Sequence, residues 1–272
     1  MKVVAATAGS AGGGAGGASR GGRGGAASDP PDETTPRPFI VAIDGPAGAG
    51  KSCAARALAA RLGFAMVDTG AIYRCVALAA SRAGVAFDDD ARLAALLPAL
   101  EIRFAPPPPG AGGAGQRVLL GAEDVSAAIR TPPMSLGASA VSARPVVRGA
   151  LLDLQRRLAT SGGNRGAVLE GRDIGTVVFP DADVKFFLTA EPEVRARRRH
   201  DELLSKGQHV PMQQVLAEQQ KRDRDDASRD VAPLRAADDA LLVDTSGLSL
   251  DGVVDALADA VRARLPPRRT PG

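Results

Sequence analysis

The sequence of 272 residues has few aromatic residues, 3% of the chain, with no tryptophan and one tyrosine. Proteins that bind single-stranded nucleic acid usually stack the bases on aromatic rings, so this scarcity argues against such a function. The net charge of +3, from 34 basic and 31 acidic residues, is also too balanced to indicate a nucleic-acid partner. We therefore expect no nucleic acid among the partners, and a core of alanine, leucine and valine.

Cysteines and long apolar runs are scarce as well. Cys53 and Cys75 form no C-x-x-C pair, and no Cys/His cluster has the spacing of a zinc site. Two thiols in an otherwise ordinary composition suggest a reducing compartment. No run of about 18 apolar residues could span a membrane, and the run at 3–8 is shorter than the roughly 7–15 residues of a signal-peptide core. We expect a cytoplasmic protein with no membrane contact.

Composition divides the chain into two tails and one central domain. Residues 1–37 are rich in Gly, Ala and Arg and cannot bury enough apolar surface to offset the entropy of ordering, so we expect this tail to be disordered. Residues 266–272 form a short C-terminal tail. Apolar residues make up 44% of the chain, which is sufficient for one sizeable α/β domain over residues 38–265.

Short apolar segments alternate with helical segments through this domain, which predicts a parallel sheet covered by helices on both faces. The expected strands are 39–43, 64–67, 167–169, 184–188 and 240–243. The expected helices are 52–62, 69–82, 139–159, 192–204, 212–227 and 250–265. Two β-like segments, 101–105 and 117–120, are joined by a tip rich in proline and glycine. They predict a hairpin within an insertion over residues 84–137.

Residues 45–52 match the phosphate-binding motif G-x-x-x-x-G-K-[ST], with an expected strand before it and a helix after it. Glycines let successive backbone N–H groups turn toward phosphate oxygens, and the helix N-terminus adds its positive dipole end. Lys51 suits the β- and γ-phosphates, and the Ser52 hydroxyl suits Mg²⁺. The alternative is a chance turn in a glycine-rich chain. The expected ATP-binding residues are Gly45, Pro46, Ala47, Gly48, Ala49, Gly50, Lys51, Ser52 and Cys53.

This motif alone does not identify a reaction, because GTPases, motors and small kinases all carry it. The sequence has no N-K-x-D motif for reading guanine, and no apolar strand that ends in a D-E pair. Glu170 closes an expected strand, where its carboxylate could organise Mg²⁺ and its waters. A strand-end carboxylate facing solvent would give the same pattern.

Further polar residues follow strands where a second ligand would lie. Thr69 can cap a helix, and Tyr73 lies on the same face with Arg74 beside it. Arg172 and Asp173 follow the carboxyl end of another strand, where open parallel sheets bind ligands. An ordinary capped helix and a turn with a local ion pair are the alternatives.

Two arginine-rich segments lie nearer the C-terminus. Arg222, Asp226 and Arg229 share one stripe of a helix, and residues 223–225 are expected to point elsewhere. Four arginines in five positions form a basic patch that suits a lid closing over the γ-phosphate: Arg195, Arg197, Arg198 and Arg199. Salt-bridged or basic surface helices are the alternatives.

Together these motifs resemble the bacterial cytidylate kinase family over about residues 39–263. The resemblance is carried by I-D-G-P-A-G-A-G-K-S at 43–52, D-T-G-A-I-Y-R at 68–74, G-R-D-I-G-T-V-V-F-P at 171–180, the 222–229 stripe and V-A-P-L at 231–234. It implies a P-loop nucleoside monophosphate kinase fold, an α/β fold with a five-stranded parallel sheet flanked by helices. It also implies an inserted acceptor-binding subdomain at 84–137 and a short lid at about 190–210. Cys53 and Ala227 depart from the family, where Thr and Ser are common.

The resemblance implies transfer of the γ-phosphate of ATP to CMP or dCMP, with Mg²⁺ as the cofactor, in pyrimidine nucleotide metabolism. It implies catalytic roles for Lys51, Arg172 and Arg229, and a metal-binding role for Ser52. The implied substrate-binding residues are Thr69, Tyr73, Arg74, Ser139, Arg148, Arg172, Asp173, Arg222, Asp226 and Arg229.

Within this set, the resemblance assigns the acceptor phosphate to Arg74, Arg172 and Arg229. It assigns the sugar to Arg222 and Asp226, and the cytosine to Ser139, Arg148 and Asp173. We expect a monomer. The open alternatives are a kinase for another nucleoside monophosphate such as UMP, and a nucleotide-binding regulator without catalysis.

Overall fold

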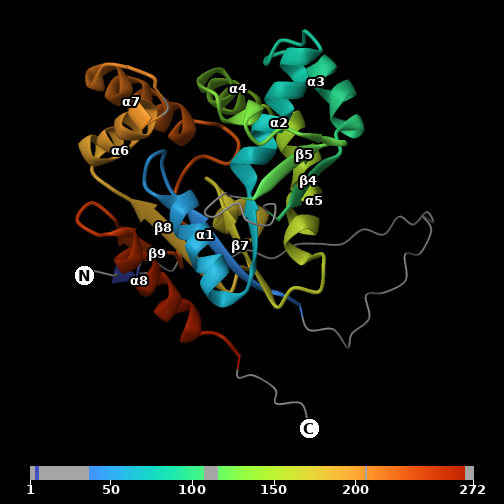
Figure 1. Cartoon of the computed structure of the whole chain (residues 1–272). Coiled ribbons are helices and arrows are strands. Elements are labelled where there is room, and N and C mark those ends of the chain that lie inside the picture. Colours follow the sequence, from blue (N-terminus) through green and yellow to red (C-terminus); the bar gives the residue numbers. More distant parts are fainter. Residues whose placement is uncertain (1–3, 6–36, 107–115, 206, 267–272) are drawn as a thin grey trace, which may run out of the picture.

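The computed structural model describes residues 4–5, 37–106, 116–205 and 207–266, and its centre is one sheet (Figure 1). The strand order is β1-β9-β8-β2-β7-β3. The strands are β1 (Val4–Ala5), β2 (Phe39–Asp44), β3 (Ala65–Asp68), β7 (Gly166–Glu170), β8 (Val184–Thr189) and β9 (Leu241–Asp244). Strands β9, β8, β2, β7 and β3 run parallel, which confirms the predicted five-stranded parallel sheet.

The central strand β2 shows how helices cover both faces of the sheet. All six of its residues are buried, and alternate side chains belong to different core clusters. Ile40 and Ala42 pack in a cluster with α2 (Thr69–Arg82) and α5 (Pro145–Thr160). Val41 and Ile43 pack in a second cluster with α1 (Lys51–Leu62) and α8 (Leu250–Arg262).

The helix expected at 139–159 is wrong as a single element. The chain forms α4 (Pro132–Ser142), turns, and then forms α5 from Pro145. Proline has no N–H to continue a helix and disfavours the helical conformation of the residue before it. Arg144 accordingly has φ −86° and ψ 121°, in the extended region.

The insertion contains the predicted hairpin, since β4 (Ile102–Ala105) pairs antiparallel with β5 (Arg117–Leu120). A short third strand that was not predicted, β6 (Glu123–Asp124), pairs with β5. The remaining elements are α3 (Asp90–Leu96), η1 (Leu97–Ala99) and η2 (Ala128–Arg130). Buried residues of the insertion, among them Leu93, Ile102 and Val118, belong to the same core cluster as Ile40 and Ala42. The described insertion therefore packs on one face of the main sheet. Its tip at 107–115 lies outside the described residues.

The predicted disorder of residues 1–37 falls mostly outside the described residues, as does the tail after 266. The prediction is wrong for Val4–Ala5, which pair antiparallel with β9, Val4 opposite Leu242. An edge strand offers unpaired N–H and C=O groups that can accept another strand. It is also wrong for Arg37, whose Nη2 lies 2.7 Å from Asp183 Oδ1. Among the described helices, none is long and apolar enough to cross a membrane.

Two helices near the C-terminus, α6 (Pro192–Ser205) and α7 (Met212–Ala227), form a hairpin that lies beside the end of β8 (Figure 1). Their contact buries Ala196, Leu203 and Val215 in a small cluster that is separate from both main clusters. The hairpin therefore depends on few apolar contacts of its own.

The α2–α4 contact allows a stability prediction. A Cβ added at Gly137 would lie 2.8 Å from Phe87 Cζ and 2.9 Å from Ala77 Cβ. We expect Gly137→Ala to destabilise the fold by about 1–3 kcal/mol through overpacking, despite the better helix propensity of alanine. Denaturant unfolding measures the change.

Gly149→Ala is the matched control, because no described atom lies within 4 Å of the Cβ that it would add to helix α5. We expect this variant to keep or raise the stability by about 0.5–1 kcal/mol. Equal stability of the two variants would contradict the tight helix contact.

Candidate functional site

The phosphate-binding loop connects the buried strand β2 to α1 and needs glycine for two separate reasons. Gly45 has φ 143°, and a Cβ there would lie 2.0 Å from the Leu188 carbonyl oxygen of β8. Gly50 has φ 86° at the start of α1, where no described side chain caps the helix. The first-turn N–H groups of α1 therefore form an uncapped helix start of the kind that binds anions.

Two side chains of α1 face polar partners around this loop. Lys51 is buried and its Nζ donates to the Pro46 carbonyl at 2.8 Å. Burial, assisted by the nearby Arg172 charge, lowers the pKa of Lys51 to about 7. Ser52 Oγ donates to Glu170 Oε1 at 2.5 Å. Glu170 is only 5% exposed, so it is not a carboxylate facing solvent, and burial raises its pKa.

Oxygen ligands at this position fit a hard divalent cation such as Mg²⁺. Ser52 provides a hydroxyl, and the Glu170 carboxylate lies against it. Among the described residues, no group of three or more His, Cys, Asp or Glu side chains could hold a metal by itself. The arrangement therefore suits a cation that binds together with nucleotide phosphates.

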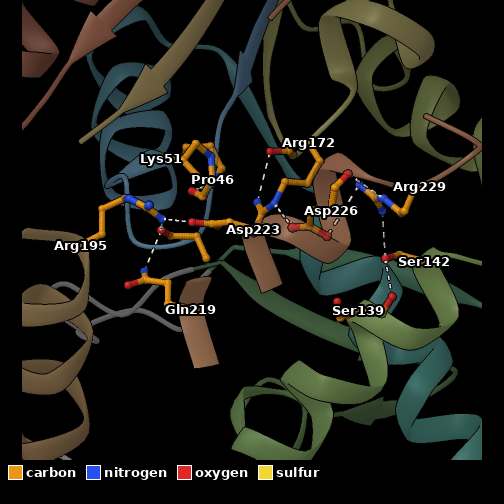
Figure 2. A network of polar contacts seen from close by, with 12 residues as sticks. Pro46, Lys51, Ser139, Ser142, Arg172, Arg195, Gln219, Asp223, Asp226 and Arg229 are labelled. Carbon is orange, nitrogen blue, oxygen red and sulfur yellow. Dashed lines mark hydrogen bonds and ion pairs between the residues drawn. The ribbon is translucent and has the colours of Figure 1, made fainter. Parts of the chain in front are cut away.

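Asp226 joins residues from several elements on the other side of the site (Figure 2). Its Oδ2 accepts from Arg172 Nε at 2.8 Å, and its Oδ1 lies 3.7 Å from Arg229 Nη2. Burial opposes ionisation of Asp226, but Arg172, Arg222 and Arg229 outweigh it and lower the pKa of this carboxyl. Three predicted acceptor-site residues thus converge, from α7, from the segment after α7, and from the end of β7.

Arg148 and Asp173, which the resemblance assigned to the cytosine, form a buried ion pair. The Arg148 guanidinium carbon also lies 5.6 Å from the centroid of the Tyr73 ring, so Tyr73 contacts the same group. Arg148 Nη1 donates to the Ser142 carbonyl at 2.9 Å. These residues come from α2, α4, α5 and the loop after β7 and make one connected cluster.

Ser142 was missed by the sequence analysis, which named Ser139 one turn earlier on the same helix. The Ser142 hydroxyl accepts from Arg229 Nη1 at 3.2 Å and donates to the Ser139 carbonyl at 2.9 Å (Figure 2). Ser142 thus contacts both Arg148 and Arg229. Its spacing of three residues from Ser139 was the available signal.

Arg74 and Arg222 complete the cationic cluster. The Nε atoms of both side chains are buried, and neither has a hydrogen-bond partner among the described residues. Burial and the nearby Arg172 charge lower the pKa of Arg222 to about 10, and Arg74 acts in the same direction. Buried guanidinium donors without a hydrogen-bond partner are costly, and a bound anion would relieve that cost.

Thr69 does not cap α2 as expected. The cap is Asp68, whose side chain accepts from Ala71 N at 2.9 Å. Thr69 Oγ1 instead donates to the Glu170 carbonyl at 2.7 Å. Thr69 therefore ties the start of α2 to the end of β7, and the carboxylate next to it does the capping.

The α6–α7 hairpin contacts the phosphate-binding loop directly (Figure 2). Arg195 Nη1 donates to the Ala47 carbonyl at 2.9 Å and to Asp223 Oδ2 at 2.6 Å. Gln219 Nε2 donates to the same Ala47 carbonyl at 2.8 Å. Asp223 was expected to point away from the stripe of Arg222, Asp226 and Arg229, and it faces Arg195 across the hairpin, whereas Asp226 faces Arg172. Gln219 is uncharged within a charged run, so no sequence signal identified it.

The other arginines of the basic patch differ in their contacts and in their exposure to solvent. Arg198 donates to the Thr245 hydroxyl at 2.9 Å and to the Thr245 carbonyl at 2.6 Å. Arg199 pairs with Glu202, and Arg197 is exposed. The patch is therefore not one free basic surface.

The family profile of cytidylate kinases matches residues 41–263 of this chain. A cytidylate kinase from Geobacter sulfurreducens is 54% identical over 236 residues, which cover 87% of this chain and 97% of that relative. A cytidylate kinase from Syntrophotalea carbinolica is 51% identical over 228 residues, which cover 84% and 94% of the two chains. The phosphate-binding loop and the arginine cluster lie within the matched region, and the chain belongs to the cytidylate kinase family.

Proposed function

We propose that the protein transfers the γ-phosphate of ATP to CMP or dCMP and releases ADP with CDP or dCDP. The observation that carries this function is the meeting of the loop and the arginine cluster, because Ser52 of the loop donates to Glu170 at 2.5 Å and Glu170 lies two residues before Arg172. A γ-phosphate and an acceptor phosphate could both be bound there. The choice of CMP rests on the family and on the relatives named cytidylate kinase.

Turnover with CMP, dCMP, UMP and AMP in parallel tests this proposal. We expect ADP release with the cytidine nucleotides and much lower kcat/KM with the others. A preference for UMP would indicate the rival kinase. ATP binding without turnover on any monophosphate would indicate a regulator without catalysis.

On the ATP side, we assign the triphosphate to the backbone of residues 45–53 and to Lys51. Mg²⁺ would be held by the Ser52 hydroxyl with Glu170 beside it, and it would neutralise charge on the β- and γ-phosphates. Catalysis then requires in-line placement and charge neutralisation, with no covalent intermediate.

On the acceptor side, Arg74, Arg172 and Arg229 are assigned to the monophosphate. Buried guanidinium nitrogens of Arg74 and Arg229 that have no hydrogen-bond partner among the described residues support this assignment. Arg222 and Asp226 are assigned to the sugar. During transfer, Arg172 and Arg229 would stabilise the charge that develops between the two phosphates.

The base is assigned to Arg148 and Asp173. Cytosine has acceptors at N3 and O2 and a donor at its exocyclic amine. The guanidinium of Arg148 has only donors, which match N3 and O2. The ionised carboxylate of Asp173 has only acceptors, which match the exocyclic amine. Uracil reverses the groups at N3 and at position 4, which would leave buried polar groups unpaired at about 1–3 kcal/mol each.

The remaining assignments concern domain organisation. We propose that residues at about 190–210 act as a lid, supported by the small separate core of the α6–α7 hairpin and its contacts with Ala47. The insertion at 84–137 would form part of the acceptor site. We also propose a monomeric, cytoplasmic enzyme, and the two free cysteines agree with a reducing compartment.

Lys51→Ala is expected to lower kcat by about 100-fold or more, because it removes charge aimed at the transferring phosphate. Steady-state kinetics with CMP measure the change. Circular dichroism and thermal melting serve as controls for the fold. Near-normal turnover in a folded variant would refute the catalytic role of Lys51.

Asp173→Asn is expected to narrow the preference for CMP over UMP, because an amide can turn its N–H toward O4 of uracil. The measurement is kcat/KM for both substrates in the wild type and the variant. Asp225→Asn is the matched control, since Asp225 is exposed and pairs with Lys221 on the outer face of α7. An unchanged ratio in Asp173→Asn would show that Asp173 does not read the base.

ATP binding is expected to take up protons at alkaline pH. The pKa of Lys51 is lowered to about 7, and the negative triphosphate would raise it again. Close to one proton should therefore enter at about pH 8, and little at about pH 6 where Lys51 is already charged. Calorimetry in buffers of different ionisation enthalpy measures this uptake. If Lys51→Met takes up as many protons as the wild type, Lys51 is not the source.

A further inference from the structure

Asp44 connects the two halves of the site through backbone hydrogen bonds. It is the last residue of β2 and lies directly before Gly45, the first residue of the phosphate-binding loop. Its Oδ1 accepts from Ile174 N at 2.8 Å, and its Oδ2 accepts from Gly175 N at 2.7 Å. Both carboxylate oxygens are thus used to hold the chain immediately after Arg172 and Asp173.

The segment that Asp44 holds has little freedom to move. Gly171 N donates to the Ile43 carbonyl at 3.0 Å, so the same end of β2 also fixes the start of this segment. A Cβ at Gly175 would lie 3.0 Å from Lys185 Cδ and 3.4 Å from Asp44 Oδ2. Residues 174–178 form a single π-helical turn, a rare local structure that is often found at functional sites.

The surroundings of Asp44 argue against a purely structural carboxylate. Asp44 is 4% exposed, and burial raises its pKa to about 7, although the two N–H donors act in the opposite direction. The charges that face it are Asp173, which also raises the pKa, and Lys51, which lowers it. Burying a carboxylate is costly, and this one lies between the two sets of substrate-binding residues.

We propose that Asp44 is a positioning residue that fixes the acceptor loop, with Arg172 and Asp173, relative to the phosphate-binding loop. The inference rests on the proposed function. In-line transfer needs the acceptor phosphate and the γ-phosphate within a narrow geometry, and an error of about 1 Å can cost on the order of 100-fold in rate. Because Asp44 joins the two loops, it would set both the relative position of the two phosphates and the position of Asp173, which is assigned to the base.

Asp44→Asn tests the proposal. An amide keeps one acceptor oxygen but turns an NH2 group toward a backbone N–H, so one loop contact becomes repulsive. We expect KM for CMP to rise by about tenfold, kcat to fall by at least as much, and the preference for CMP over UMP to narrow. KM for ATP should change by less than about twofold, because residues 45–53 themselves are untouched.

Asp183→Asn is the matched control at the other end of strand β2, because Asp183 precedes β8 and bonds to the backbone of β2. Asp183 Oδ2 accepts from Ile40 N at 2.7 Å near the opposite end of β2, far from the loops along the strand. This variant also loses a carboxylate–backbone bond. We expect lower thermal stability without a change in KM for CMP or in the CMP to UMP ratio.

Gly175→Ala keeps Asp44 and disturbs its contact with Gly175 from the loop side, so it tests the proposal if Asp44→Asn does not fold. In this variant too, KM for CMP should rise while KM for ATP changes little. Equal effects on CMP and ATP, or a pattern that matches Asp183→Asn, would overturn the inference. A wild-type protein that phosphorylates no cytidine nucleotide would instead overturn the proposed function.

Discussion

The chain keeps several guanidinium groups close together around one buried carboxylate, and the proposed acceptor side of the site depends on this arrangement. Asp226 contacts Arg172 and Arg229, and these arginines together with Arg222 lower its pKa despite burial. Further carboxylates act on the same arginines, Glu170 and Asp223 on Arg172 and Asp173 on Arg229. The charges of Arg172 and Arg222 also reach Lys51, whose pKa burial lowers and these charges lower further.

The sheet brings these groups together because its parallel strands end at one edge. The phosphate-binding loop follows β2, the pair Arg172 and Asp173 follows β7, and α2 follows β3. Asp44 and Thr69 then bond across neighbouring strand ends. The α6–α7 hairpin joins the same loop through Ala47, while its apolar contacts form a cluster of their own. The apolar contacts of the α6–α7 hairpin are therefore separate from the core that supports the strand ends.

Most of the site could be predicted because its residues lie in short, local motifs. The glycines of the motif at 45–52 and the helix after it define the loop conformation locally. The segments at 68–74 and 171–180 carried the family resemblance. Errors arose where contacts join distant segments. The helical pattern separated Asp223 from the stripe of Arg222, Asp226 and Arg229, but it could not identify the partner Arg195, which lies on another helix. Ser142 and Gln219 bond to residues far away in the sequence, and apart from the three-residue spacing of Ser142 from Ser139 no sequence signal marks these contacts.

The sequence by itself determined the parallel α/β class, the phosphate-binding loop and the family, since these depend on apolar periodicity and on contiguous motifs. Tertiary structure alone decided that Arg148 pairs with Asp173, that Asp68 rather than Thr69 caps α2, and that one helix is broken before Pro145. It also decided that Asp44 holds the acceptor loop. Side-chain partners far apart in sequence are selected by packing, and local propensity does not encode which donor lies opposite which acceptor.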